Sequence, residues 1–567
     1  MSDKLNTGGK IVEITGITPE VVESIPNQHL EELNRLRKLT GSELTFHGPL
    51  VEATGLARDG WEEGRRQQAE RQMLSAVERG RKLDPDGNIV ITFHSTTALP
   101  EMIQRSKIDG QGKGEQTTEI FVIDERGGAL SPLKIKPNYF LKDEQPNAQK
   151  MIEQMNEEAW DKRLSHTAFQ AHAGKGQFER AQHRIDQVNI PEELKSKSLF
   201  EQYAKQGTPE GESFMKALNP ETRKVATDIF NDINHGEIYV RDAYNELQNL
   251  YNDAYATAQK LDNKESLNKL QELREHLLPK IQKEGLKDPK NIEALGDELV
   301  ESLKVISLMK APQTLRPLQD FALDKASDTF SNVAFKAFKQ FGDTTPIISI
   351  ENPPAGGGIS RGEDLRQLVA KTREKFVQQA TRSKDEGGSG LSEHEAEDQA
   401  KKLIGVTWDV GHINMLRKFG YSKEDVVKET EKIAPMIKHV HLSDNFGMEH
   451  TELPMGMGNV PMKEHLKLIE QYNKKAKQIV ETGHWYNHFQ RSPLPETFAA
   501  FGSPIYGMTA APYWNQAHGR MSGGYFAGHG MNPDVHHSMY GAGFSALPVE
   551  LGGQMAGRNR LSGAPME

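Results

Sequence analysis

Short continuous runs of apolar residues recur along the chain, and a segment with helical periodicity follows most of them. Continuous runs, as opposed to strict alternation, are typical of strands that are buried on both faces of a parallel sheet. Eight runs fit this description: KIVEITG (10–16), ELTFHG (43–48), NIVITFHS (88–95), PIISIEN (346–352), IGVTWDVG (404–411), IKHVHLSD (437–444), KQIVETG (477–483) and SPIYGM (503–508). Segments between them, such as SKEDVVKETEKIAPM, place apolar residues at helical spacing.

Eight strands with intervening helices predict an α/β protein folded as a closed (β/α)8 TIM barrel. A doubly wound open sheet is the alternative that the same alternation allows. The barrel interpretation assigns residues 1–100 to strands 1–3 and residues 316–508 to strands 4–8. About 250 residues separate strands 3 and 4, where a βα connection needs only a few tens, so we expect a large insertion there.

The insertion contains two different patterns. TTEIFVIDERGGALSPLKIKP has the pattern of two strands around ERGG, which predicts a hairpin insertion within residues 101–144. Charged amphipathic sequence then predicts a helical insertion over residues 145–315. Because additions on the C-terminal side of a barrel strand can cover an active site, we expect these helices to form a lid or a protein contact. A solvated helical spacer is the alternative.

Two other segments lack the strand and helix patterns. The low-complexity stretch RSKDEGGSGLSEHEAEDQ predicts a flexible excursion over residues 382–399. Past residue 509 the chain is rich in Gly, Met, His and aromatic residues, and we expect a disordered C-terminal tail over residues 509–567. We expect the tail histidines to be unstructured surface residues and not metal ligands; they are His518, His529, His536 and His537.

Composition narrows the chemistry and the compartment. The 567 residues include no cysteine, which excludes disulfides, thiolate metal ligands and cysteine nucleophiles. Lys and Arg total 70 against 80 Asp and Glu, and the net charge of −10 disfavours a general nucleic-acid binder. No apolar segment has the length of a signal peptide or of a membrane span, so we expect a cytoplasmic protein with no membrane partner.

Side chains that can bind a metal stand at or just past the C-terminal ends of six successive strands. They are His47, His94, Glu351, Asp409, His441 and Glu481. In a parallel barrel these ends converge on one mouth, so residues remote in sequence come close to a common centre. Buried carboxylates and imidazoles need compensation there, which a divalent cation provides. The sequence therefore predicts a metal site, against the alternative that these residues only close strands and turns.

The predicted ligands are all nitrogen and oxygen donors, which suit Zn, Mn, Fe, Co or Mg, and several imidazoles disfavour calcium. We expect one to three divalent ions, with Zn²⁺ or Mn²⁺ favoured. His439 stands two residues before His441, so the two side chains point to the same face of the strand. We expect His439 to pack or hydrogen-bond below His441, and Asp444 to orient a ligand or cap the following turn.

Several segments together resemble a known family. The motifs SIENP, WDVGHIN, HVHLSDNFG, ELPMGMGNV and IVETG are similar, in their order and placement, to signatures of the xylose isomerase-like TIM-barrel superfamily. That superfamily includes sugar isomerases and epimerases and the endonuclease IV group of abasic-site endonucleases, AP endonuclease family 2. The resemblance covers residues 10–95 and 346–508 and leaves the insertion and the tail outside it.

The resemblance implies a set of ligands for each ion. One divalent ion, shared by both branches, would be held by Glu351, Asp409, His441 and Glu481. In the nuclease branch, His47 and His94 would join Glu351 around a second ion.

The resemblance gives His412 two different roles. In the nuclease branch His412 would bind a third ion, whereas in the epimerases its equivalent contacts the substrate. The other third-ion ligands depart from the family pattern Asp-x-His, because EHTELPMGMG places His450 and Glu452 there with the residue types in exchanged order. A solvated loop is the alternative for these two residues.

Three functions stay open. As an isomerase or epimerase, the protein would polarise a hydroxyketone with its ion while Glu351 and Glu481 transfer protons through an enediol and His412 holds a substrate hydroxyl. As a nuclease, it would use two or three zinc ions to generate hydroxide and cleave a phosphodiester. As a non-catalytic module, it would keep the metal for structure and bind through the helical insertion.

Two observations separate these functions. HLSDNFG and LPMGMGNV resemble the sugar isomerase branch more closely, and HGPLVEATGL after His47 offers no aromatic side chain to wedge into a duplex. The presence of both His47 and His94 favours the nuclease. We favour a sugar or sugar-phosphate isomerase or epimerase, and therefore a small sugar substrate over DNA.

Overall fold

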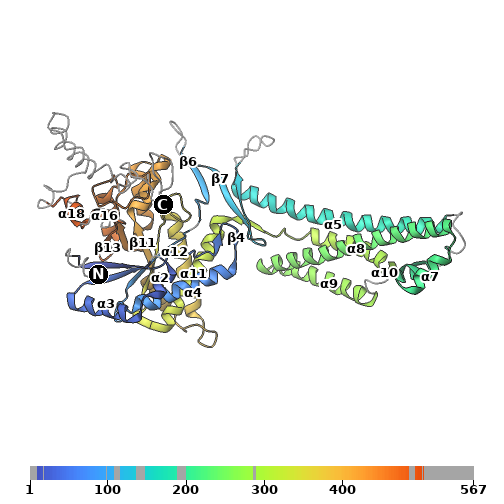
Figure 1. Cartoon of the computed structure of the whole chain (residues 1–567), viewed down its shortest axis with the longest axis horizontal. Helices are drawn as coiled ribbons and strands as arrows, with labels where there is room; N and C mark the ends of the chain where they lie inside the picture. Colours follow the sequence, from blue (N-terminus) through green and yellow to red (C-terminus); the bar gives the residue numbers. More distant parts are fainter. Residues whose placement is uncertain are drawn as a thin grey trace, which may run out of the picture. The chain divides into compact units, whose positions relative to one another are not determined.

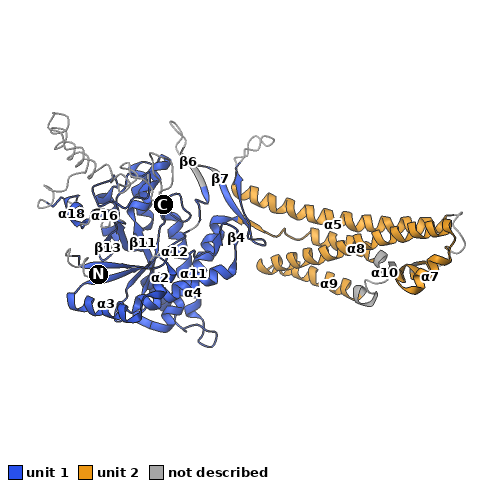
Figure 2. Cartoon of the chain, viewed as in Figure 1, with its two compact units in different colours: residues 1–146, 317–567 blue, residues 147–316 orange. Residues whose placement is uncertain are grey.

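The computed structural model describes residues 9–16, 18–97, 99–107, 115–135, 147–187, 194, 199–284, 289–483, 485, 489, 492–500 and 502–503. The chain divides into two compact units (Figure 2). Residues 1–146 and 317–567 form the larger unit, and residues 147–316 form the smaller unit. The predicted tail over residues 509–567 and its four histidines lie outside the described residues.

A seven-stranded parallel sheet is the centre of the larger unit (Figure 1). Its strands are β1 (Ile11–Thr15), β2 (Glu43–His47), β5 (Val90–His94), β10 (Ile347–Glu351), β11 (Ile404–Asp409), β12 (Ile437–Leu442) and β13 (Lys477–Val480). They pair in this same order, each in parallel with the next. The prediction of an α/β protein with a parallel sheet is therefore confirmed.

The sheet curls into a nearly closed barrel. Lys477 Nζ of β13 lies 2.9 Å from Glu43 Oε2 of β2, so the two ends of the sheet approach each other. A doubly wound sheet would break the sequential strand order at a switch point, and this sheet has no such break among its seven described strands. The architecture is consistent with a TIM barrel. The eighth strand predicted at residues 503–508 lies outside the described residues after Ser503.

Helices connect the strands and surround the sheet (Figure 1). They are α2 (Pro19–Ser24), α3 (Asn27–Thr40), α4 (Glu63–Arg81), α11 (Leu318–Phe341), η2 (Gly342–Thr344), α12 (Gly362–Thr381), α13 (Glu393–Leu403), α14 (Val410–Asn414), η3 (Met415–Phe419), α15 (Lys423–Ile433), η4 (Ala434–Met436), α16 (Met462–Tyr472) and α18 (Leu494–Ala500). Phe321 and Phe330 of α11 are buried in the core of this unit.

The flexible excursion predicted over residues 382–399 is wrong for residues 393–399. Residues from Glu393 onward form α13, which begins with a capping box at Ser392. This helix buries Ala396 and Ala400 at a spacing of one helical turn. The many glycines and charged residues of the segment indicate flexibility, and two small apolar residues are too weak a pattern to predict a helix from the sequence.

Short antiparallel pairs complete the larger unit. β7 (Glu115–Asp124) pairs with β6 (Ile103–Lys107) and with β8 (Leu130–Lys134). The β7–β8 pair encloses the ERGG sequence, and Gly128 there has a positive φ of 68°, which glycine adopts without steric cost. The hairpin predicted around ERGG is therefore present. β3 (Leu56–Ala57) and β4 (Gly60–Trp61) form a further two-residue pair.

The smaller unit is helical. Its helices are α5 (Ala148–Asp186), α6 (Leu199–Ala204), α7 (Pro209–Ala217), α8 (Pro220–Lys260), α9 (Lys264–Glu284) and α10 (Pro289–Ser307), and β9 (Leu315–Pro317) follows them. Gly174 of α5 and Gly236 of α8 permit a close approach, because a Cβ at Gly174 would lie 2.6 Å from Val240. None of the helices in the described part of the chain is long and apolar enough to cross a bilayer.

Candidate metal centre

Polar side chains line the barrel in two layers, where TIM barrels usually pack branched apolar residues. The lower layer consists of Glu13, Thr45, Thr92, Ser349, Thr407 and His439, all buried. The upper layer, two residues further along five of these strands, consists of His47, His94, Glu351, Asp409 and His441. Thr92 of β5 and Thr407 of β11 are hydrogen-bonded at 2.9 Å although β10 lies between their strands, as expected for side chains inside the barrel.

Four metal-capable residues lie together at the C-terminal end of the barrel. This core group consists of Glu351, Asp409, His441 and Glu481, whose ligand atoms all lie within 4.8 Å of one another. His441 Nδ1 is 2.8 Å from Glu351 Oε1 and 2.7 Å from Glu481 Oε2. A ring nitrogen has at most one proton to donate, so Nδ1 cannot satisfy both carboxylates.

The core group holds three carboxyl groups, and Asp409 resists ionisation because it is buried and the other two stand beside it. Burial and the neighbouring carboxylates of Glu481 and Glu351 raise the pKa of Asp409 well above its usual range. Asp409 Oδ2 is buried and has no hydrogen-bond partner among the described residues. Burial also opposes the ionisation of Glu351, but His441 and His94 hold its pKa well below the usual range.

A second group adjoins the core group through Glu351. His47 Nε2 and His94 Nε2 each lie 3.2 Å from the same oxygen, Glu351 Oε2. His47 Nδ1 donates to the Gly48 carbonyl at 2.9 Å. Although burial opposes the charged ring, the hydrogen bond to Glu351 raises the pKa of His47 to about 9, so a metal ion would bind Nε2 in place of a proton. The ligand atoms of His47, His94 and Glu351 lie within 4.8 Å of one another.

The third group consists of His412, His450 and Glu452, again within 4.8 Å of one another. His412 Nδ1 donates to the Asn352 carbonyl at 2.7 Å, and its Nε2 lies 2.7 Å from His450 Nε2. Burial lowers the pKa of His412 to about 4 and that of His450 to about 3, so both rings are neutral at pH 7. Burial and Glu481 raise the pKa of Glu452 to about 8.

The loop after β12 brings the exchanged His450 and Glu452 to His412. Asp444 and Leu453 exchange two backbone hydrogen bonds of 2.8 Å, which close the loop that carries both residues. Asp444 also accepts hydrogen bonds from the backbone of Asn445, Gly456 and Val460. It therefore has the turn-capping role, one of the two that its position predicts.

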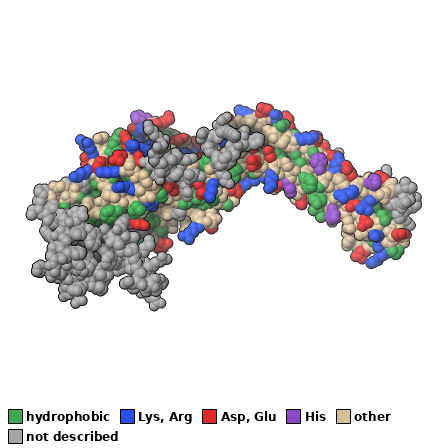
Figure 3. Space-filling model, turned by 90° about the horizontal axis from the view of Figure 1, so that it is seen from above, with side chains coloured by type: hydrophobic (Ala, Val, Ile, Leu, Met, Phe, Trp, Pro, Cys, Tyr) green, Lys and Arg blue, Asp and Glu red, His purple; other side chains and the backbone are tan. Residues whose placement is uncertain are grey.

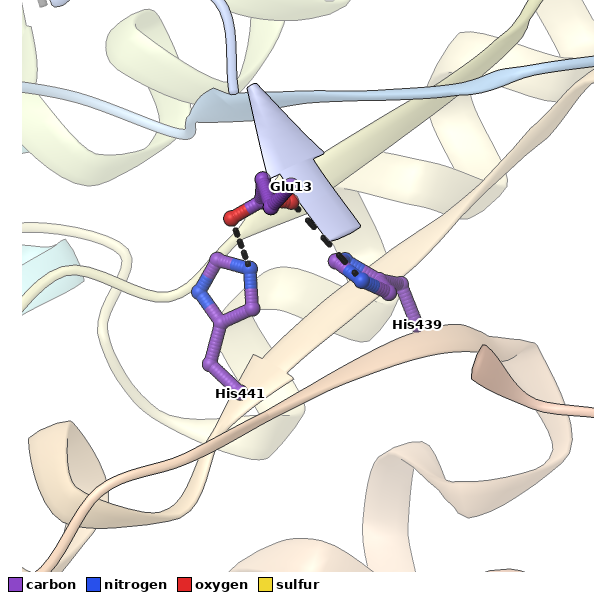
Figure 4. Close-up of side chains that lie close together, drawn as sticks. All are labelled: Glu13, His439 and His441. Atoms are coloured by element: carbon purple, nitrogen blue, oxygen red, sulfur yellow. Dashed lines mark ion pairs between the residues drawn. The ribbon is translucent and has the colours of Figure 1, made fainter. Parts of the chain in front are cut away.

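The sequence interpretation missed Glu13. This glutamate stands in the middle of β1, and Figure 4 shows its carboxylate between the rings of His439 and His441. Glu13 Oε1 is 3.2 Å from His441 Nε2, and Oε2 is 3.8 Å from His439 Nε2. An acidic residue inside an otherwise apolar strand run was the available signal. His439 Nδ1 lies 3.3 Å from Thr92 Oγ1, in the layer below His441, as its spacing predicts.

The donors at the barrel mouth fit a divalent cation. All are imidazole nitrogens or carboxylate oxygens, which bind Zn²⁺ and Mn²⁺. Asp409 Oδ2, which has no hydrogen-bond donor in the described structure and lies 3.7 Å from His412 Nε2, and the shared Nδ1 of His441 have the contacts that a cation would complete. The nine metal ligands predicted from the sequence all belong to one of the three groups.

Comparisons with known proteins add little. No family model and no curated protein matches the chain. Among solved structures, the chain is similar to one described as "Crystal structure of D-tagatose 3-epimerase-like protein", with 23% sequence identity and a TM-score of 0.20. The match covers 29% of this chain and 48% of that chain. The fold class therefore rests on the strand order, and the candidate chemistry rests on the clustered side chains.

Proposed function

We propose that the protein is a divalent-metal-dependent isomerase or epimerase that acts on a sugar or sugar phosphate through an enediol. The observation that carries this proposal is the placement of two carboxylates around one centre. Glu351 and Glu481 come from β10 and from the end of β13, yet both approach His441 Nδ1 within 2.8 Å. Two carboxylates around one bound carbon can remove a proton from it and return a proton to it or to its neighbour.

The two carboxylates differ in accessibility, which suggests different duties. The Glu351 side chain is 1% exposed and is in contact with His47, His94 and His441. The Glu481 side chain is 25% exposed, so a substrate can approach it from the mouth. A bound divalent ion would supply Lewis-acid polarisation of a substrate carbonyl. Glu481 would then take the proton next to that carbonyl, and Glu351 would serve the other side of the carbon.

His412 suits a substrate contact in this proposal. Its Nδ1 donates to the Asn352 carbonyl, and its neutral Nε2 lies 2.7 Å from Nε2 of the exposed His450, so a substrate hydroxyl would replace His450 as the donor to Nε2. A neutral imidazole nitrogen accepts a hydrogen bond from a sugar hydroxyl without adding charge beside the ion.

Solvent exchange tests the proposal directly. Metal-loaded protein should convert at least one ketose or ketose phosphate, and in D₂O the product should carry deuterium at the carbon next to the carbonyl. Glu481→Gln should lose both conversion and exchange. The matched control is Glu449→Gln, an exposed carboxylate on the loop after β12, which should retain both. Absence of turnover and exchange across a broad ketose panel would refute the isomerase proposal.

A phosphodiester hydrolase of the endonuclease IV type is the second candidate, with abasic-site DNA as substrate. The observation in its favour is that three ligand groups lie at one barrel mouth, since multi-metal sites suit phosphodiester cleavage. Against it, the face seen in Figure 3 intersperses Lys and Arg with Asp and Glu over the described residues. Binding to a duplex backbone usually requires a more continuous basic surface.

Metal stoichiometry separates the two candidates. Protein purified without chelator or added metal should hold near one equivalent as an isomerase and near three as a hydrolase, because only the hydrolase needs the second and third groups filled. Cleavage of a duplex with a single abasic site should occur only for the hydrolase. Retained metal without either activity would favour a non-catalytic module that binds a partner through its helical unit.

A further inference from the structure

Glu13 is a buried carboxylate with no role in either candidate reaction. It is 7% exposed and lies in β1 between Val12 and Ile14. Burying an ionised carboxylate is costly unless nearby groups compensate it. Thr45 Oγ1 donates to Oε2 at 2.9 Å, while Oε1 faces His441 Nε2 at 3.2 Å (Figure 4).

His441 has one nitrogen toward each layer. Its Nδ1 lies among the core-group carboxylates, and its Nε2 points to Glu13. A neutral imidazole carries one proton, so a proton on Nε2 leaves the lone pair of Nδ1 free for a metal ion. Carboxylates that contact the outer nitrogen of a ligating histidine fix its tautomer and ring orientation and increase its basicity.

We propose that Glu13 is a positioning residue of the metal centre, which holds His441 in the tautomer and orientation that direct Nδ1 to the ion. The inference rests on metal binding at the core group, which both candidate functions require. It does not depend on which reaction follows.

The lower layer keeps Glu13 in place. Thr407 Oγ1 donates to Ser349 Oγ at 2.7 Å and is bonded to Thr92, and Thr92 in turn reaches His439. His439 Nε2 then faces Glu13 Oε2 at 3.8 Å, on the side away from His441 (Figure 4). With Thr45 on the same carboxylate oxygen, these contacts leave Glu13 little freedom to turn away from His441.

A second ion is the competing explanation for Glu13. Ligand atoms of Glu13, His439 and His441 also lie within 4.8 Å of one another. An ion there would make Glu13 a ligand, and its loss would remove one equivalent of metal. A positioning residue instead changes how tightly the same number of ions binds.

Metal affinity measured by competition with a chromophoric chelator tests the inference, with the absorption spectrum of bound Co²⁺ as a second readout. Glu13→Leu removes the carboxylate that lies 3.2 Å from His441 Nε2 and should raise the Kd for Zn²⁺ about 10–100-fold, with an unchanged number of ions. Glu13→Gln keeps a neutral acceptor and should fall between Glu13→Leu and the wild type. The Co²⁺ bands should shift in the same order, because the orientation of His441 changes.

The control is Glu429→Gln. Glu429 is equally buried at 6% exposure but lies on α15, where it accepts a hydrogen bond from the backbone of Gly362. Its substitution should leave the Kd for Zn²⁺ unchanged. If Glu13→Leu does not fold, Thr45→Val replaces it: loss of the hydroxyl that holds Oε2 should raise the Kd in the same direction but less.

Three results would overturn the inference. Unchanged Kd and Co²⁺ spectra in the Glu13 variants, or in Thr45→Val where it is the variant used, would show that His441 needs no such support. Loss of a whole equivalent of metal would make Glu13 a ligand. If the wild-type protein binds no divalent ion, both the proposed function and the role of Glu13 are refuted. This result is seen in the wild-type protein alone, so it is distinguishable from the other two, which appear only in the variants.

Discussion

Asp409→Asn should stabilise the metal-free protein and stop metal from stabilising it further. Asp409 is fully buried, and its Oδ1 accepts hydrogen bonds from His412 N at 2.8 Å and Ser443 Oγ at 3.1 Å. Its Oδ2 has no hydrogen-bond partner within the described structure. Asparagine keeps a carbonyl oxygen for both donors and removes the charge that burial and the nearby Glu481 and Glu351 disfavour.

The size of both effects follows from these contacts. A buried polar atom without a partner costs about 1–3 kcal/mol, so the metal-free variant should gain stability of that order when its amide N–H₂ donates to the neighbouring Glu351 or Glu481 carboxylate. An ion present at about 100 times its Kd stabilises the native protein by about 2.7 kcal/mol. The variant should lose this gain, because a neutral amide oxygen is a much weaker ligand than a carboxylate oxygen.

Urea unfolding in EDTA and in excess Zn²⁺ measures both effects, with Asp444→Asn as the control. Both carboxylate oxygens of Asp444 accept backbone hydrogen bonds, Oδ1 from Asn445 and Val460 and Oδ2 from Gly456. An amide there would turn an N–H toward a backbone N–H, so the control should destabilise by about 1–3 kcal/mol. The reasoning is refuted if Asp409→Asn destabilises the metal-free protein as the control does, or retains the gain from Zn²⁺.

Three further predictions concern the site and the scaffold. Burial lowers the pKa of His465 from 6.5 to about 4, so the unfolded chain takes up a proton at a higher pH than the folded protein. The free energy of unfolding in EDTA should therefore fall as the pH drops from about 6.5 to about 4. His465→Gln should flatten that part of the pH profile, and an unchanged profile would contradict the assignment. Glu481→Gln should reduce metal affinity and abolish turnover, and unchanged metal content together with unchanged turnover would exclude the core group as the site. Gly362→Ala should destabilise the protein by about 1–3 kcal/mol in urea unfolding, because its Cβ would overlap the carbonyl oxygen of Glu429. Gly176→Ala, with open space around it on α5, should stabilise the protein by about 0.5–1 kcal/mol, and equal effects of the two variants would be inconsistent with this packing.

The parallel strands were predictable because each is a continuous apolar run of its own. The run at 347–351 becomes β10 and the run at 404–409 becomes β11, with the predicted neighbours in the predicted order. Elements that depend on tertiary contacts were not predictable. The two-residue strands β3 and β4 carry no periodicity, and α13 begins inside a segment that composition alone marks as flexible.

The candidate site was predictable to the extent that it depends on strand ends. His47 and Glu351 end β2 and β10, and the parallel register brings their side chains together. The exchanged order of His450 and Glu452 could not be resolved, because the shape of a loop depends on contacts that the sequence does not specify. Glu13 could not be predicted because its partner His441 lies on β12, and only the curvature of the sheet brings β1 close to β12.

The two polar layers differ in how well their hydrogen-bonding groups are satisfied. In the lower layer, Thr407, Thr92 and Ser349 bond to one another across the barrel. In the upper layer, Asp409 Oδ2 has no hydrogen-bond partner among the described residues, and two carboxylates share one ring nitrogen. His439 Nε2 of the lower layer also lacks a hydrogen-bond partner in the described structure. The upper layer differs in having more carboxylate oxygens than donors, and such an excess indicates a missing positive ligand there. The lower layer is then best understood as the rigid support that keeps the upper layer ready to bind it.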